Sequence, residues 1–207
     1  MYSSENEMNF NLEVLFVLLS YLIGSIPVGY LLTKFYTGKN ILKMGSGNVG
    51  STNVGRVAGR KIALITQLLD MSKGFLTVAF YLYFTEDKKI ESVISVYVLA
   101  LAAIIGHDVS IFLKFKGGKG VNTTLGASVL IAPFSVFISV AVYFIVKMRF
   151  KYVSLGSMIL GISLPFTELI FHGFTSTFYY LMFCMALIIL MHRKNIVRLL
   201  HNQELSS

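Results

Sequence analysis

The sequence predicts an all-α membrane protein whose helices cross the bilayer several times. Of its 207 residues, 55% are hydrophobic and only 14% are charged, whereas soluble domains carry about 25% charged residues. The apolar residues lie in blocks long enough to cross a bilayer, which takes about 20 residues of helix. We therefore expect one integral membrane domain over residues 1–207.

Six apolar blocks follow one another along the chain. The first is preceded by acidic residues and lacks the basic start and small-residue end of a cleavable signal peptide, so we expect it to remain as a permanent span. The single cysteine lies in the last block, where it is expected to act as a small buried hydrophobe. The blocks are residues 12–36, 62–84, 92–106, 121–146, 153–171 and 176–191.

The distribution of basic residues indicates the number and direction of the spans. Lysines and arginines cluster after the first, third, fourth and last blocks, and the positive-inside rule places such clusters in the cytoplasm. Six spans would leave two of these clusters outside. Two short helices within 121–146, turning near Ala132–Pro133, bring every cluster to the cytoplasm, and proline suits such a turn. The sequence thus predicts seven transmembrane helices, with the N-terminus outside and the C-terminus cytoplasmic.

A glycine-rich segment follows the first block. Its glycines allow positive φ values and let successive backbone N–H groups approach an anion. Hydroxyls and amides add neutral donors, and the final arginine adds a forked cation suited to phosphate. The alternative is a flexible linker on a basic face, which does not account for the paired asparagines. The candidate phosphate-binding residues are Gly45, Ser46, Gly47, Asn48, Gly50, Thr52, Asn53 and Arg56.

A second glycine-rich segment runs from Lys114 to Thr124 and precedes an apolar helix, whose free N–H groups can receive an anion. The spacing of a Walker A motif is absent, so we infer phosphate binding without nucleotide hydrolysis. A positive-inside anchor explains the lysines but not three glycines within four positions. His107, which closes the preceding block, is either a structural hydrogen-bonding residue or part of the site. The loop candidates are Gly117, Gly118, Lys119 and Gly120.

Three further groups of polar residues lie near or within the apolar blocks. His192, Asn195 and Arg198 share one helical face after the last block, where they form a site or simply complement the helix dipole. Ionisable residues inside a span are costly, so Asp70 and Lys73 either pair with one another or let the lysine reach a phosphate. At the start of the fifth block, Ser154 and Ser157 are helix caps or substrate contacts.

Together these segments resemble the bacterial acyl-phosphate:glycerol-3-phosphate acyltransferases, small membrane proteins that start phospholipid synthesis. The matches run in the family's order over nearly the whole chain, and each departure leaves the family's catalytic positions in place. The matching segments are Gly24–Tyr30, Gly45–Arg56, Asp70–Gly74, Gly106-His107 with Phe115–Val121, and His192–Leu199 with Glu204. The departures are Ser51 and Asn122, where alanine is usual, Val109-Ser110 in place of Phe-Pro, and Asn202 in place of glycine.

The resemblance implies a role for most of the candidate residues. It implies a seven-span fold whose active site lies at the cytoplasmic face. Lys73, His107, Ser157 and the glycine-loop residues named above are then substrate-binding, and Glu204 is structural. The residues implied to be catalytic are Ser46, Arg56, Lys119, His192 and Asn195.

The reaction that the resemblance implies moves a fatty acyl group from acyl phosphate to the 1-hydroxyl of glycerol 3-phosphate, giving lysophosphatidic acid and phosphate. Acyl phosphate is an activated mixed anhydride, so we expect direct attack by the substrate hydroxyl, without an enzyme nucleophile, metal or cofactor. The proton acceptor is either His192, whose ordinary pKa suits the role, or a phosphate oxygen of the donor.

We expect the two substrates and the lipid bilayer to be the only partners, with no nucleic acid and no obligate protein partner. The expected location is the bacterial cytoplasmic (inner) membrane. The main alternative function is a membrane transporter for phosphorylated solutes, which predicts internal repeats and a polar path through several spans. A lipid phosphotransferase would need clustered carboxylates to hold a metal, and the apolar blocks lack them.

Overall fold

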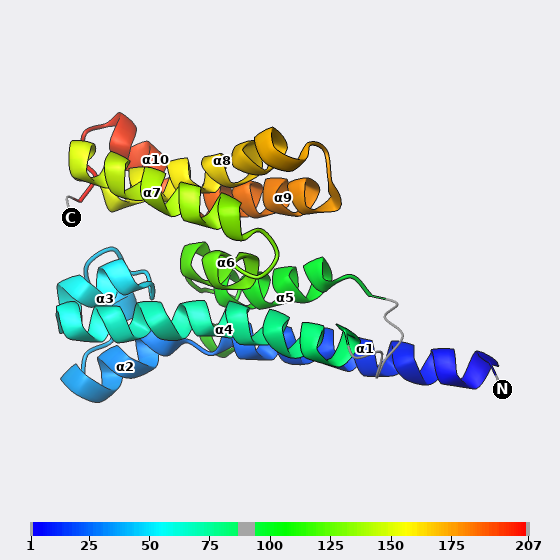
Figure 1. Cartoon of the computed structure of the whole chain (residues 1–207). Helices are drawn as coiled ribbons and strands as arrows, with labels where there is room; N and C mark the ends of the chain where they lie inside the picture. The colour runs from blue at the N-terminus through cyan, green and yellow to red at the C-terminus, as the bar shows by residue number, and fades with distance from the viewer. Residues whose placement is uncertain (1, 87–93, 206–207) are drawn as a thin grey trace.

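The computed structural model describes residues 2–86 and 94–205, in which every regular element is helical. Long helices lie side by side, and the N-terminus projects from one end while α2, α3 and the C-terminus lie at the other (Figure 1). Short 3₁₀ turns occur at Ile41–Lys43 and Ile111–Leu113. The helices are α1 (Tyr2–Ser25), α2 (Val28–Thr37), α3 (Ser51–Ala58), α4 (Arg60–Glu86), α5 (Val96–Asp108), α6 (Val121–Ser128), α7 (Pro133–Phe150), α8 (Val153–His172), α9 (Ser176–Met191) and α10 (Arg193–Leu200).

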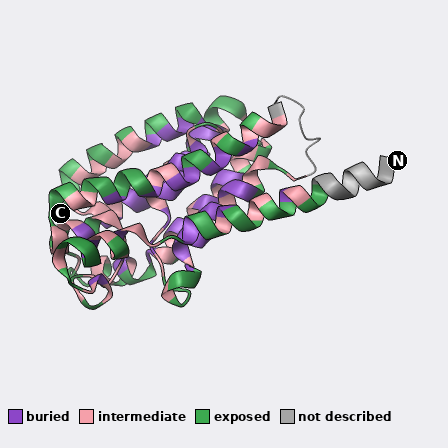
Figure 2. Ribbon diagram, turned by 90° about the horizontal axis from the view of Figure 1, so that it is seen from below, coloured by how far each residue is buried: buried purple, intermediate pink, exposed green. Residues whose placement is uncertain are grey.

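The helices carry the burial pattern of a membrane protein. Large apolar side chains lie on the outside, such as Phe137 at 73% and Ile170 at 79% exposure, while serines and threonines are buried between helices (Figure 2). Five helical segments are long and apolar enough to cross a bilayer, and a sixth is added if α9 and α10, which meet at a 58° bend, count as one span. The predicted all-helical membrane fold is therefore confirmed, with five or six candidate spans.

The block at 121–146 is divided into two helices, as the sequence predicts. α6 ends at Ser128, and Pro133 is the first residue of α7. α6 has 8 residues and is about 12 Å long at 1.5 Å per residue, too short to cross a bilayer alone.

The first two residues of the predicted block 92–106 lie outside the described residues.

Close helix contacts are made where glycines replace side chains. A Cβ atom at Gly24 of α1 would lie 2.1 Å from the carbonyl oxygen of Ala103 in α5, and one at Gly106 would lie 2.2 Å from that of Tyr21 in α1. The same relation holds between α4 and α6, where a Cβ atom at Gly74 would lie 2.2 Å from the Thr123 oxygen. Such small residues let membrane helices approach closely, so α5 and α6 are fixed against α1 and α4.

The first apolar block forms one candidate span, Phe10–Thr37, as the sequence predicts, but its helix is interrupted. α1 ends at Ser25 and α2 begins at Val28. Pro27 separates them, and proline cannot donate the N–H that would continue the helix. Carbonyls freed by such a break must find other donors inside a membrane.

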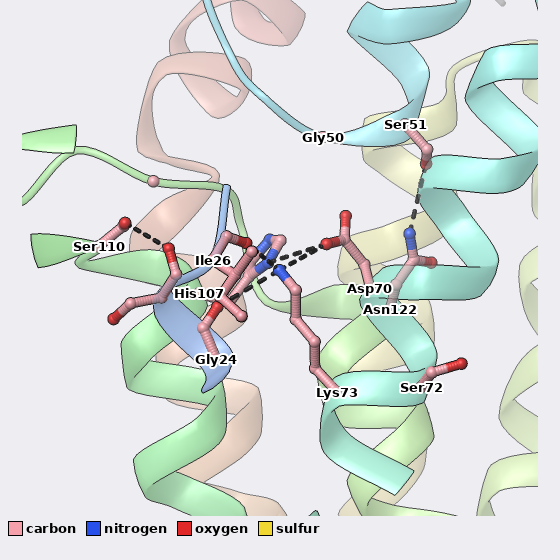
Figure 3. Close-up of polar contacts among 12 residues, drawn as sticks. Gly24, Ile26, Gly50, Ser51, Asp70, Ser72, Lys73, His107, Ser110 and Asn122 are labelled. Atoms are coloured by element: carbon pink, nitrogen blue, oxygen red, sulfur yellow. Dashed lines mark hydrogen bonds and ion pairs between the residues drawn. The ribbon is translucent and has the colours of Figure 1, made fainter. Parts of the chain in front are cut away.

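Lys73 of α4 provides those donors. Its ammonium donates to the carbonyl of Gly24 at 3.3 Å and to that of Ile26 (Figure 3). Asp70 lies one turn earlier on α4 and accepts a hydrogen bond from the same ammonium at 2.9 Å, which balances its charge. The hydroxyl of Ser110 donates to the third exposed carbonyl, that of Ser25, at 2.5 Å. Lys73 and Ser110 therefore satisfy the backbone of the broken span.

Replacing Lys73 with methionine should destabilise the protein. The change leaves the Asp70 carboxylate and the freed carbonyls without their partner in a buried site, and breaking a buried ion pair costs about 3 kcal/mol or more. Thermal unfolding in detergent can be followed with a thiol-reactive dye, since the one cysteine, Cys184, is buried. Lys61→Met, at an exposed position of the same helix, should unfold like the wild type. Equal unfolding midpoints for the two variants would contradict this role of Lys73.

Candidate functional site

The first glycine-rich loop is shaped by Asn53, which reaches back from α3 beneath it. The Asn53 amide donates to the carbonyls of Met44 at 3.0 Å and Asn48 at 2.8 Å, and its oxygen accepts from the Ser46 N–H at 2.9 Å. Gly45 has a φ of 57°, and a Cβ atom there would lie 2.2 Å from the Asn53 oxygen. Since Asn53 is only 2% exposed, the loop is a fixed turn rather than a flexible linker.

Asn48 connects this loop to the second one. Its side-chain oxygen accepts from the Gly50 N–H at 2.8 Å, and its amide nitrogen donates to the carbonyl of Gly117 at 3.3 Å. Next to it, Val49 is buried against Ile41 and Val54. The two glycine-rich loops, 69 residues apart in sequence at this contact, are therefore neighbours in space.

The second loop packs directly on the end of α5. The Gly118 N–H donates to the His107 carbonyl at 2.9 Å, and a Cβ atom at Gly118 would lie 1.9 Å from the His107 ring nitrogen Nε2. Gly120 has a φ of 69°, and a Cβ atom there would lie 3.0 Å from both carboxylate oxygens of Asp108. Close approach therefore requires both glycines, and the positive φ of Gly120 favours glycine there as well.

His107 joins the second loop to the ion pair inside the bundle. Its Nδ1 atom lies 3.6 Å from the Asp70 oxygen that also accepts from Lys73. A cavity of about 10 Å³ lies between Lys73, His107 and Gly117, enough space for one water molecule. Lys73 and His107, expected among the substrate-binding residues, thus lie behind the loop and contact protein groups.

The chain end supplies the other side of the site. Glu204 accepts hydrogen bonds from Asn195 at 2.7 Å, Ser154 at 3.0 Å and Arg198 at 3.0 Å, and its side chain is 4% exposed. The Asn195 oxygen in turn accepts from the Lys119 ammonium at 2.6 Å. Glu204 therefore holds α8, α10 and, through Asn195, the second loop together.

Cations outnumber carboxylates in this region. The charges of Glu204, Arg198 and Arg56 all act on Lys119, and Arg56 also donates to the Leu205 carbonyl at 3.3 Å. Burial is the main cause that lowers the pKa of Lys119, to about 8, while the Glu204 charge partly offsets it. With three cations around one carboxylate, the site favours the binding of an anion.

His192 follows α9 at the same end of the bundle and is 2% exposed. Its Nδ1 atom lies 2.8 Å from the Ile188 carbonyl, which can only accept, so Nδ1 carries the proton. Burial, helped by the charge of Lys119, lowers the pKa of His192 to about 4. The ring is therefore neutral at physiological pH, with Nε2 as a hydrogen-bond acceptor.

The structure brings most of the candidate residues from the sequence to one end of the bundle. Ser46, Arg56, Lys119, His192 and Asn195 lie on the loops and helix ends described above. Ser154 contacts Glu204, while Ser157 is buried one turn further along α8.

Sequence reasoning missed the buried carboxyl group of Asp108. It is 4% exposed, and neither of its oxygens has a hydrogen-bond partner among the described residues. Its one sequence signal is an acidic residue directly after His107, at the end of an apolar block. Within the described ranges no group of three or more His, Cys, Asp or Glu side chains is arranged to hold a metal ion.

Comparison with known proteins gives consistent results. The sequence profile of the glycerol-3-phosphate acyltransferase family matches residues 14–202. A glycerol-3-phosphate acyltransferase from the bacterium Clostridium acetobutylicum is 41% identical over 193 residues, covering 92% of this chain and 98% of that protein. Another, from Staphylococcus haemolyticus, is 38% identical over 201 residues, covering 92% and 96%.

Two crystal structures share the fold. Both are of PlsY (YgiH), an integral membrane glycerol 3-phosphate acyltransferase, with 34% sequence identity to this chain. The glycerol 3-phosphate form superposes with a TM-score of 0.83, covering 94% of each chain. The lysophosphatidic acid form gives 0.78, covering 93% of this chain and 94% of that one.

Proposed function

Because the chain belongs to the glycerol-3-phosphate acyltransferase family, we infer that it is a membrane enzyme that acylates glycerol 3-phosphate to lysophosphatidic acid. The observation that carries this inference is the convergence of two fixed glycine-rich loops on a cationic cluster at one end of an apolar bundle. We propose that acyl phosphate is the donor, and that residues 1–207 act as a single domain in the bacterial cytoplasmic membrane.

Each of the two loops would bind the phosphate group of a different substrate. Ser46 and the backbone N–H groups from Gly47 to Gly50 hold the acyl phosphate, and Gly117 to Gly120 hold the phosphate of glycerol 3-phosphate. Lys119 and Arg56 balance the phosphate charges. The contact between Asn48 and Gly117 keeps the loops adjacent, which suits a reaction between two bound substrates.

The chemical step would be direct attack. The 1-hydroxyl oxygen of glycerol 3-phosphate bonds to the acyl carbonyl carbon, the bond from that carbon to the phosphate oxygen breaks, and inorganic phosphate leaves. Because the pKa of His192 is near 4, its neutral ring is a weak proton acceptor. It is better suited to orient the 1-hydroxyl of glycerol 3-phosphate by a hydrogen bond. The departing phosphate therefore takes the hydroxyl proton. Positioning and charge stabilisation supply the rate enhancement.

We also propose seven membrane crossings with the N-terminus outside. α6 and α7 together would cross twice, with α6 shielded by α4, against which it packs. This arrangement places the loops, the start of α8 and α10 at the cytoplasmic face, where glycerol 3-phosphate is available. Reporter fusions after Tyr152 and at the C-terminus should both report a cytoplasmic location, and an external signal at either would contradict the seven-span arrangement.

The purified protein should release phosphate and form lysophosphatidic acid at equal rates from palmitoyl phosphate and glycerol 3-phosphate. Ser46→Ala and Lys119→Ala should each lower kcat/KM about 100-fold or more, since each removes a donor to a charged group. Lys61→Ala, at an exposed position, serves as the control. Activity with acyl-CoA alone would contradict the proposed donor. Trapping of an acyl group on Ser46, or ping-pong kinetics, would contradict direct attack.

The activity should fall in alkaline solution because Lys119 loses its proton. Its pKa in the free protein is about 8, and both ionisations of a phosphate monoester are complete below that pH, the second having a pKa of about 6. We expect kcat/KM for glycerol 3-phosphate to decrease above pH 8, and kcat to hold to higher pH because bound phosphate favours the ammonium. In Lys119→Arg the residual activity should lack this decrease. A decrease that begins only near the ordinary lysine pKa would contradict the buried environment of Lys119.

A further inference from the structure

Ser51 and Asn122 form a second link between the two loops. The Asn122 amide nitrogen donates to the Ser51 hydroxyl oxygen at 3.3 Å, across 71 residues of sequence (Figure 3). Ser51 is the first residue of α3, and Asn122 is the second residue of α6. The N-terminal ends of the two helices that follow the phosphate-binding loops therefore meet at this hydrogen bond.

This contact joins two of the positions at which the sequence departs from the pattern of the family that it resembles. Alanine is usual at both positions in the family that the sequence resembles, and an alanine pair has no hydrogen bond to make. Here the two polar residues meet each other, so the substitutions form one physical unit.

The hydroxyl hydrogen of Ser51 is available to donate a hydrogen bond. A hydroxyl has one hydrogen to donate and can accept two hydrogen bonds. Since Asn122 donates to the Ser51 oxygen, the hydroxyl hydrogen points elsewhere, and within the described ranges Ser51 donates no side-chain hydrogen bond to another residue. A hydroxyl that accepts one hydrogen bond is polarised and donates more strongly. The first N–H groups of α3 beside it also lack partners within their helix.

The supporting structure holds the pair in place without depending on it. α6 is packed closely on α4 through Gly74 and Gly126, and α3 also contacts α4. Asn53, two residues after Ser51 in α3, is fixed by its own three hydrogen bonds. Both Ser51 and Asn122 are half-buried, so loss of their hydrogen bond should change the site more than the stability of the fold.

We propose that Ser51 is an additional substrate-binding residue that donates its hydroxyl hydrogen to the phosphate group of the acyl phosphate, and that Asn122 is the positioning residue that orients it. This proposal rests on the proposed function, which assigns the first loop to the acyl phosphate. Asn122 acts through Ser51, so the two residues contribute one effect rather than two. A hydroxyl-to-phosphate hydrogen bond is charge-assisted and stronger than a neutral one.

The test is a double-mutant cycle on the purified full-length enzyme, with palmitoyl phosphate and glycerol 3-phosphate as substrates. Ser51→Ala should raise KM for palmitoyl phosphate about tenfold, the effect of one lost charge-assisted hydrogen bond. KM for glycerol 3-phosphate and kcat should stay within about twofold, because neither the second loop nor the reacting atoms lose a contact. Asn122→Ala should raise the same KM less than Ser51→Ala, and the double variant should match Ser51→Ala.

Two further variants separate this role from a structural one. Ser51→Thr keeps the hydroxyl and should keep the wild-type KM. Ser72→Ala removes an exposed hydroxyl of α4 that bonds only to the Leu68 carbonyl of its own helix, and it should leave both KM values unchanged. All variants should have the wild-type unfolding temperature when thermal unfolding is measured by the reaction of Cys184 with the thiol-reactive dye.

The outcomes that overturn the proposal are distinct from failure of the proposed function. Multiplied effects in the double variant would mean that Asn122 acts independently of Ser51. Equal rises in both KM values, or a wild-type KM for palmitoyl phosphate in Ser51→Ala, would show that Ser51 does not bind the acyl phosphate. If the wild-type enzyme fails to use palmitoyl phosphate, the proposed donor is wrong; if it turns over and Ser51→Ala is unaffected, only the present proposal fails.

Discussion

The ammonium group of Lys73 links the interrupted first span to the middle of the helix bundle. A helix broken inside a membrane exposes carbonyl groups that water cannot reach, and each unsatisfied one costs several kcal/mol. Lys73 donates to two of them and to Asp70. Asp70 in turn faces the His107 ring, on which the second glycine-rich loop packs. A single buried cluster thus connects the break between α1 and α2 with the loop that we assign to glycerol 3-phosphate.

The site around this cluster is rigid because side chains replace regular secondary structure as partners for the backbone. Asn53 and Asn48 bond to the first loop, and the His107 carbonyl bonds to the second. Glu204 joins three polar side chains near the chain end. Donors held in this way need little rearrangement when an anion binds, which is the condition for electrostatic catalysis without an enzyme nucleophile.

The sequence predicts the class of fold and the main segments of the site because those signals are local. Apolar blocks indicate membrane helices, and runs of glycine beside lysine or arginine predict anion-binding loops before their position in the fold is known. The break between α1 and α2 was missed as a feature of the fold, although Pro27 is its visible signal. Hydropathy averages over that single residue.

The partners of individual side chains could not be read from the sequence. The sequence left open whether Lys73 and His107 contact protein groups or a substrate, and only the structure shows their contacts with Gly24, Asp70 and Gly118. The contact between Ser51 and Asn122 joins positions 71 residues apart, and only the packing of α3 and α6 on α4 brings them together. Ser154 and Ser157 share a local pattern, and the fold of the chain end brings Ser154 to Glu204.

We infer that the buried cluster of Asp70, Lys73 and His107 fixes the second loop, and hydrogen exchange at Gly118 can measure this. The Gly118 N–H donates to the His107 carbonyl in the folded protein, so its exchange reports the opening of that loop. In Asp70→Asn, which removes the charge facing His107, we predict faster exchange at Gly118 while amides in the middle of α8 keep their wild-type rates. Unchanged exchange at Gly118 would contradict the claim, because the loop would then hold its shape without the cluster beneath it.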